Sequence, residues 1–151
     1  MNSPRRLSPG DPALPQVLAL IRESFGYMDG RISPPSSMHR LTAAAIARAG
    51  EVWVLGAPPR ACVFLTPKPG RLYLGKLAVN SQYRGKGLAR QLVEHAAARA
   101  RDLGLPVLEL QTRIELTGNH AAFARMGFVK TGETAHPGFT RPTSITMQRR
   151  V

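Results

Sequence analysis

The 151-residue sequence lacks the features that mark several large classes of protein. Its one cysteine, Cys62, has no partner for an intrachain disulfide, which suits a reducing cytoplasm. No apolar run approaches the roughly 20 residues that span a bilayer, so no membrane segment is expected. The first residues, MNSPRRLSPGDP, carry basic side chains with no apolar stretch behind them, which argues against a signal peptide.

Acidic and aromatic residues are also scarce. Nine Asp and Glu stand against 21 Lys and Arg, giving a net charge of +12 that attracts anions such as nucleic acids or phosphorylated cofactors. A nucleic-acid-binding protein more often gathers its basic residues on one face and interleaves aromatic ones. Here the arginines are scattered and aromatics make up 6% of the chain, so nucleic-acid binding is kept only as an alternative.

The hydrophobic pattern predicts one α/β (α+β) domain over residues 1–151. Asp11-Pro12 is a typical helix start, Gly104 a typical helix end, and APPR and TPKPG are turn-forming separators between short apolar strands. We expect a mixed, mostly antiparallel sheet of about six to seven strands flanked by about four helices. The expected helices cover residues 14–25, 37–49, 88–103 and 118–126, and the expected strands cover 51–55, 61–65, 71–79, 105–112, 128–132 and 141–150.

A glycine-rich loop, QYRGKGLA at 82–89, connects an expected strand to an expected helix. The first N–H groups of a helix have no partner within the helix, and the helix dipole favours negative charge there. Gly85 and Gly87 have no side chain to keep a phosphate from the backbone, and Arg84 and Lys86 add positive charge. The loop is therefore interpreted as a phosphate-binding site.

Two common phosphate loops are excluded by their spacing. The nucleoside-triphosphatase loop requires Gly-Lys-Ser/Thr, but Gly87 is followed by Leu88. The dinucleotide-binding fingerprint requires a third glycine where Arg90 stands, and it opens the first βαβ unit of its domain, whereas three strands precede this loop.

The spacing Gln82-x-x-Gly85-x-Gly87, preceded by LAV and followed by an amphipathic helix, resembles the acetyl-coenzyme A loop of the GCN5-related N-acetyltransferase (GNAT) family. The downstream strand LPVLEL and the segment ARMGF extend the resemblance over about residues 51–132. The family fold implies that the strands over 71–79 and 105–112 splay apart to admit coenzyme A. It also implies that a set of loop residues cradles the pyrophosphate: Gln82, Arg84, Gly85, Lys86, Gly87 and Leu88.

The resemblance further implies that Leu77, Ala78 and Val79 offer strand-edge hydrogen bonds to the pantetheine arm. The expected function is a cytoplasmic, acetyl-CoA-dependent N-acyltransferase that acts by direct attack of a primary amine, on a small molecule or a peptide. No metal site is predicted. The alternative is a non-catalytic coenzyme A-binding module, and the sequence leaves the acceptor, the acyl chain length and the oligomeric state open, a homodimer included.

The catalytic pattern of the family is incomplete in this sequence. Phe123 stands where many members have a proton-donating tyrosine, and Leu116 stands where an asparagine often precedes it. Phe123 is therefore expected only to contact the cofactor. Asn119 either contacts the cofactor or caps the short helix, and both alternatives stay open.

Candidates for the remaining chemistry are few. Glu115 and Tyr73 are the catalytic candidates, while Glu109 is expected to point to the other sheet face. His120 and His136 are further candidates for a base. Asp29, Arg31 and His39, in the irregular segment GYMDGRISPPSSMHR, are expected to bind the acceptor.

Overall fold

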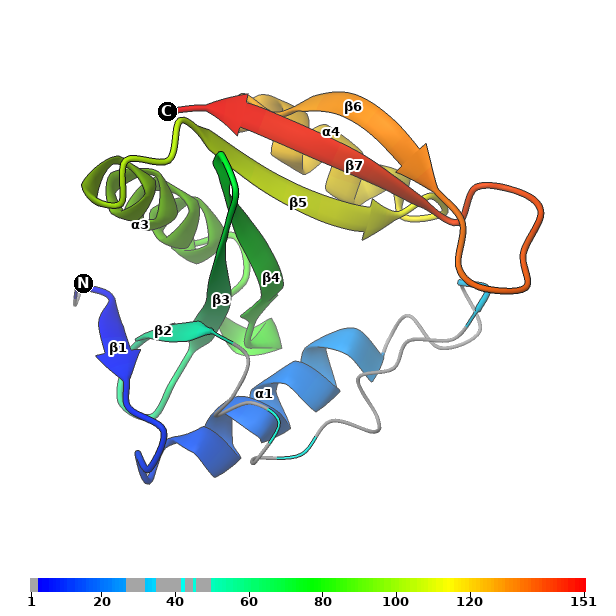
Figure 1. Ribbon diagram of the computed structural model, residues 1–151. Helices are drawn as coiled ribbons and strands as arrows, with labels where there is room; N and C mark the ends of the chain where they lie inside the picture. The colour runs from blue at the N-terminus through cyan, green and yellow to red at the C-terminus, as the bar shows by residue number, and fades with distance from the viewer. Residues whose placement is uncertain (1–2, 27–31, 35–41, 43–44, 46–49) are drawn as a thin grey trace.

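The computed structural model describes residues 3–26, 32–34, 42, 45 and 50–151, and their strands form one seven-stranded sheet in the order β1-β2-β3-β4-β5-β7-β6 (Figure 1). The predicted mixed α/β architecture is confirmed. The elements are β1 (Arg5–Leu7), α1 (Leu14–Gly26), β2 (Glu51–Leu55), β3 (Ala61–Lys68), β4 (Arg71–Val79), the 3-10 helix η2 (Ser81–Tyr83), α3 (Leu88–Asp102), β5 (Val107–Arg113), α4 (Thr117–Arg125), β6 (Val129–Thr134) and β7 (Ser144–Arg150).

The helices largely follow the sequence signals. At the start of α1, Asp11 Oδ1 accepts a hydrogen bond from the N–H of Ala13 at 2.9 Å, as its capping position predicts. The described residues contain three α-helices against the four expected, because the predicted helix over 37–49 falls almost entirely outside them. None of the helices described is long and apolar enough to cross a membrane.

Two strand boundaries differ from the prediction. β1 was not predicted, because three residues are too few to show a period; it pairs antiparallel with β2, Leu7 opposite Val52. The strand predicted to end at residue 65 continues to Lys68, since the β3–β4 hairpin pairs as far as Lys68 with Arg71. The turn therefore uses only the Pro-Gly end of TPKPG, where Gly70 has φ +74°.

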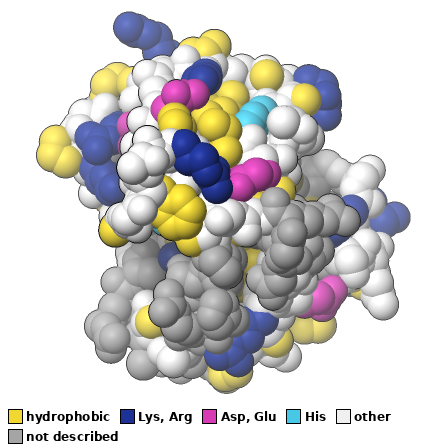
Figure 2. All heavy atoms as spheres, turned by 90° about the vertical axis from the view of Figure 1, so that its right-hand side faces the viewer, with side chains coloured by type: hydrophobic (Ala, Val, Ile, Leu, Met, Phe, Trp, Pro, Cys, Tyr) yellow, Lys and Arg dark blue, Asp and Glu magenta, His cyan; other side chains and the backbone are white. Residues whose placement is uncertain are grey.

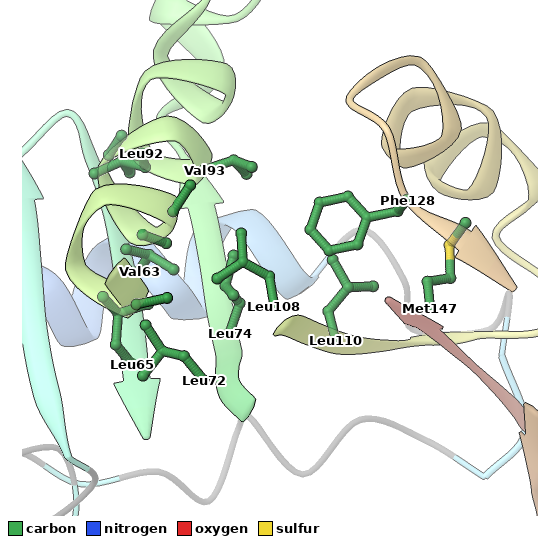
Figure 3. Packing of buried hydrophobic residues seen from close by; sticks show 14 of the residues in the cluster. Val63, Leu65, Leu72, Leu74, Leu92, Val93, Leu108, Leu110, Phe128 and Met147 are labelled. Carbon is green, nitrogen blue, oxygen red and sulfur yellow. The ribbon is translucent and has the colours of Figure 1, made fainter. Parts of the chain in front are cut away.

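Helices cover the two faces of the sheet differently. On one face, α3 packs on the central strands: Figure 3 shows Leu72, Leu74 and Leu108 beneath Leu92 and Val93. On the other face, α1 packs on β1 to β4 in a second buried cluster that includes Ile21 and Phe64. Successive side chains along each strand point to these two faces in turn.

The parallel strands β4 and β5 separate soon after they meet. Their pairing consists of Leu72 with Leu108 and Tyr73 with Glu109, after which β4 continues to Val79 and β5 to Arg113 without pairing each other. In Figure 1, β4 and β5 visibly diverge, and β5 leaves with β6 and β7. We call the opening between residues 74–79 and 110–113 the wedge.

A buried ion pair joins β2 to α3 away from the wedge. The carboxylate of Glu51, 8% exposed, accepts hydrogen bonds from Arg99 Nε and Nη2 at 2.9 Å each and from Trp53 Nε1 at 3.0 Å. Burial alone would raise the pKa of Glu51. The hydrogen bonds from Arg99 and Trp53 and the charges of Arg99 and Arg6 outweigh burial and hold that pKa below its ordinary value.

Replacing Arg99 by methionine is therefore expected to lower the free energy of unfolding by about 2–3 kcal/mol at neutral pH, because it leaves a buried carboxylate unpaired. The stability that Glu51 contributes is present above its unfolded pKa, near 4.5, and is lost as the pH falls through the lower folded value. Urea unfolding should thus show the difference between Arg99→Met and wild type shrinking in acid. The exposed Arg101→Met variant should stay within about 0.5 kcal/mol; an equal loss in both variants would contradict this assignment.

Candidate functional site

The glycine loop lies directly after β4 and is built by local hydrogen bonds. The side-chain oxygen of Asn80 accepts from the N–H of Gln82 at 2.9 Å, and its carbonyl accepts from the N–H of Tyr83 at 2.9 Å. These bonds form η2, which delivers the exposed residues 84–87 to the start of α3. The guanidinium of Arg60, the residue before β3, lies 4.6 Å from the centre of the Tyr83 ring.

Both glycines of the loop adopt left-handed backbone conformations. Gly85 has φ +76° and Gly87, the N-cap of α3, has φ +78°. A Cβ built at either position would meet nothing within 4 Å, so the space beside the backbone is open. The first α3 hydrogen bond runs from the N–H of Gln91 to the carbonyl of Gly87, which leaves the N–H groups of residues 88–90 directed out of the helix end. An anion fits these donors and this space.

The residues predicted to bind the pyrophosphate differ in the exposure of their side chains. Gln82, Arg84 and Lys86 have exposed side chains, whereas the side chain of Leu88 is 2% exposed and belongs to the core under α3. Leu88 can therefore face a ligand only through its backbone N–H.

The wedge lies next to this loop, and along it one edge of β4 pairs with no other strand among the described residues. A bulge interrupts the β3–β4 pairing, since Cys62 pairs with Ala78 but Phe64 pairs with Gly75. At the end of the strand, Ser24 of α1 donates a hydrogen bond from Oγ to the carbonyl of Val79 at 3.2 Å. Among the three predicted edge residues, Val79 thus already has a partner for its carbonyl group.

α4 lies on the α3 side of the sheet, where Phe123 packs against the buried cluster under α3. The ring of Phe123 meets that of Phe128 edge-on, with centroids 5.8 Å apart, so its packing is secured without a hydroxyl group. Leu116 is the N-cap of α4, and the N–H of Asn119 donates to the carbonyl of Leu116 at 3.0 Å. Asn119 is the third residue of the helix, so the capping alternative is wrong. A cofactor contact remains a prediction for it.

Comparison with known proteins assigns the chain to a family. The sequence model described as the Acetyltransferase (GNAT) family matches residues 19–128. The chain belongs to the GNAT family. Rat N-acetyltransferase 8B is 39% identical over 92 residues, which are 58% of this chain and 40% of the rat protein. Rat N-acetyltransferase 8F1 is 41% identical over 81 residues, 52% of this chain and 37% of that protein. The chain therefore matches about two-fifths of the length of these relatives.

Solved structures share the whole GNAT fold at low sequence identity. The PaiA N-acetyltransferase of Thermoplasma acidophilum in complex with coenzyme A matches with a TM-score of 0.81 and 15% identity over 100% of both chains. The ribosomal-protein-S18-alanine N-acetyltransferase of Escherichia coli matches with a TM-score of 0.68 and 20% identity, covering 99% of this chain and 94% of that one.

In this GNAT domain, Tyr73 leans into the wedge from its closed end. A Cβ at Gly75 would meet the Tyr73 ring at 3.6 Å, so the ring lies over the glycine two residues further along β4. Burial and the charge of Glu109 raise the pKa of Tyr73, while a hydrogen bond from the backbone of Gln111 lowers it by less. The phenol is therefore neutral near physiological pH, and its oxygen lies beside β5 within the wedge.

Glu109, in contrast, is held in a hydrogen-bonded network on the sheet. Its oxygens accept from Arg71 Nε at 2.9 Å and from Gln148 Nε2 at 2.8 Å. A carboxylate bound on both oxygens is a structural group, and it is a poor base for a ligand in the wedge.

The remaining sequence candidates gather at the outer end of β5. Glu115 is exposed, and its Oε2 accepts from the N–H of Ser33 at 3.1 Å. His120 Nε2 lies 2.9 Å from the carbonyl oxygen of Arg113, and His136 Nδ1 is hydrogen-bonded to Thr143 Oγ1. Figure 2 shows this end of the molecule, where basic, acidic and histidine side chains mix with hydrophobic ones. Burial, followed by the charge of Arg113, lowers the pKa of His136.

Glu115 thus links the loop at 32–34 to the β5–α4 junction, and its catalytic role stays a prediction. The predicted acceptor residues Asp29, Arg31 and His39 lie outside the described residues.

One residue of the wedge was missed by the sequence reasoning. Lys76, at the β4 bulge, has φ +51°. Among the residues that the structure describes, it is the one non-glycine residue with a positive φ. Its Nζ lies 5.3 Å from the centre of the Phe64 ring on the α1 side of the sheet, and burial lowers its pKa. The signal was present in the sequence, since Gly75-Lys76 interrupts an otherwise apolar strand in RLYLGKLAV.

Proposed function

We propose that this GNAT domain transfers an acetyl group from acetyl-CoA to a primary amine by direct attack. The observation that carries the proposal is the wedge opening beside a glycine loop whose backbone donors point away from α3. A phosphorylated carrier with a long amide-containing arm matches both features, because the loop suits the phosphates and the β4 edge suits the arm. The complex of the Thermoplasma relative with coenzyme A supports this choice of carrier.

The chain's residues would hold this substrate in two ways. Backbone N–H groups from Gly85 to Ala89, with Arg84 and Lys86 beside them, would bind the pyrophosphate through charge-assisted hydrogen bonds. The free edge of β4 at Leu77 and Ala78 would pair with the amides of the arm. An arm that starts at the loop and runs back along β4 brings its thioester to the bulge, where Tyr73 leans in from the closed end.

The transfer needs a proton acceptor and a proton donor. As the amine nitrogen bonds to the thioester carbon and the C–S bond breaks, one proton leaves the nitrogen and the thiolate gains one. Phe123 has no proton to give. We assign the donor role to Tyr73, whose raised pKa keeps its phenol protonated. Cys62 is fully buried and burial raises its pKa to about 12, so no acyl-cysteine intermediate is proposed.

A second candidate function, coenzyme A binding without catalysis, is favoured by Phe123 alone. Calorimetry with acetyl-CoA and a thiol-release assay with a panel of amines separate the two. Saturable binding together with release above the hydrolytic rate supports an enzyme, whereas binding without release supports a binding module. Salt-sensitive binding of nucleic acid that coenzyme A does not displace would instead support the third, nucleic-acid-binding alternative.

A further inference from the structure

We propose that Lys76 is the general base of this site, the group that receives the proton from the attacking amine. The inference rests on the proposed function, because it requires the thioester to lie in the wedge. It adds a residue that the resemblance to the GNAT family did not supply.

The backbone at Lys76 is the first observation. A lysine at φ +51° is strained, since its Cβ crowds the backbone in the left-handed region that glycine and asparagine tolerate better. Gly75 stands directly before it in the same strand, yet the bulge position itself carries a lysine. Strained residues of this kind cluster at functional sites, where their side chain must point in a particular direction.

The direction of the Lys76 side chain is the second observation. Its Nζ lies over the face of Phe64, 5.3 Å from the ring centre, within the cluster that α1 covers. This side of β4 is opposite the one on which α3 and α4 pack. Lys76 therefore lies on the α1 face of β4, the face from which we infer that the amine approaches the thioester, while α3 packs on the other face.

The charges around Lys76 are the third observation. On β3, the titratable group that acts on Lys76 is the buried thiol of Cys62. It raises the pKa of Lys76 by less than burial lowers it. On α1, Glu23 is exposed and accepts from Ser81 Oγ at 3.0 Å; on β5, both oxygens of Glu109 are engaged by Arg71 and Gln148. Among the described residues, no carboxylate forms an ion pair with Lys76.

A half-buried amine without a carboxylate partner loses its proton more readily than an exposed one, which is how lysines become general bases. In the step proposed, the neutral Nζ of Lys76 takes the proton from the amine nitrogen as the C–N bond forms. Lys76 leaves the step as an ammonium group and returns the proton to water, while the thiolate is protonated by Tyr73. No oxidant, reductant or further reactant is needed.

Two variants show whether Lys76 acts as a general base or only supplies a positive charge. Lys76→Arg keeps a positive charge but cannot deprotonate, and Lys76→Asn removes the charge while tolerating the left-handed backbone. With the fastest amine of the panel, both variants should lose about 10²- to 10⁴-fold in kcat/KM. Their affinity for acetyl-CoA by calorimetry should stay within about 3-fold of wild type, since the pyrophosphate loop is intact. If the wild-type protein fails to bind acetyl-CoA, the proposed function itself is wrong, which this control reveals separately.

A titration gives a readout that needs no acceptor. The chain has four lysines, at positions 68, 76, 86 and 130, so ¹³C-lysine labelling of the full chain gives one Cε signal for each. The signal missing in Lys76→Arg should titrate at the lowest pH of the four, and kcat/KM of wild type should rise with pH across the same range. Titration of Lys76 together with the other three, or activity of Lys76→Arg within about 3-fold of wild type, would overturn the proposal.

Discussion

Replacing Gly87 by leucine is expected to weaken acetyl-CoA binding by about 100-fold, or about 2.7 kcal/mol. Gly87 has φ +78°, and the space beside its backbone is open to solvent, so the protein itself has room for a side chain there. The leucine would instead occupy the space through which a phosphate reaches the N–H groups at the start of α3. Each charge-assisted hydrogen bond lost there is worth about 1.5–3 kcal/mol.

Gly104 provides a matched control at the other end of the same helix. It has φ +71°, and a Cβ at this position would likewise meet nothing within 4 Å, but its N–H donates to the carbonyl of Arg101. Gly104→Leu should therefore cost the same backbone strain, about 1–2 kcal/mol of stability, while leaving acetyl-CoA affinity unchanged. Calorimetry and thermal unfolding of both variants test this pair. Equal loss of affinity in both would mean that strain, and not a blocked phosphate site, explains the effect.

Tyr73→Phe is expected to reduce kcat by about 10²-fold, at the low end of what a general acid contributes, because a thiolate is a tolerable leaving group. Only the hydroxyl is removed, so the ring still covers Gly75 and still lies 4.5 Å from Lys68 Nζ. KM for acetyl-CoA and the affinity measured by calorimetry should change little. A loss that appears in KM and not in kcat would contradict the role of proton donor.

Phe123→Tyr offers a test of rescue for the same role. Phe123 of α4 packs against the cluster on the α3 side of the sheet, so a hydroxyl at position 123 would approach the thioester from that side. In the Tyr73→Phe background it should restore kcat by about 10-fold, whereas alone it should change kcat little because a donor is already present. A Tyr73→Phe variant as fast as wild type, together with a faster single Phe123→Tyr variant, would show that wild type has no working acid.

Local sequence patterns were sufficient for much of this fold. The apolar alternation in 51–79, the turn residues and the helix-ending Gly104 predicted the meander and α3, and the structure confirms them. The Gln82-x-x-Gly85-x-Gly87 spacing predicted the glycine loop between β4 and α3, because that loop depends on a few neighbouring residues in fixed backbone conformations. Phosphate binding by this loop stays a prediction. These features are local, so a single sequence carries enough information to find them.

The features that were missed depend on contacts between distant segments. The short strand β1 exists only because β2 offers it an edge, and the hydrogen bond from Ser24 to Val79 joins residues 55 positions apart. Glu109 was correctly placed on the face opposite Leu108, but its binding to Arg71 and Gln148 could not be seen from its own strand. Lys76 was visible as an interruption of an apolar strand, yet its role depends on the bulge and on Phe64 in β3.

Measuring acetyl transfer itself tests the proposed function most directly. The full chain should be incubated with acetyl-CoA and the amine panel, and both free thiol and acetylated amine should be quantified, the latter by mass spectrometry. We expect the two products to appear in equal amounts, and we expect Gly87→Leu to reduce both strongly at an acetyl-CoA concentration that half-saturates the wild type. Saturable acetyl-CoA binding with no acetylated amine from any member of the panel would contradict the proposed function.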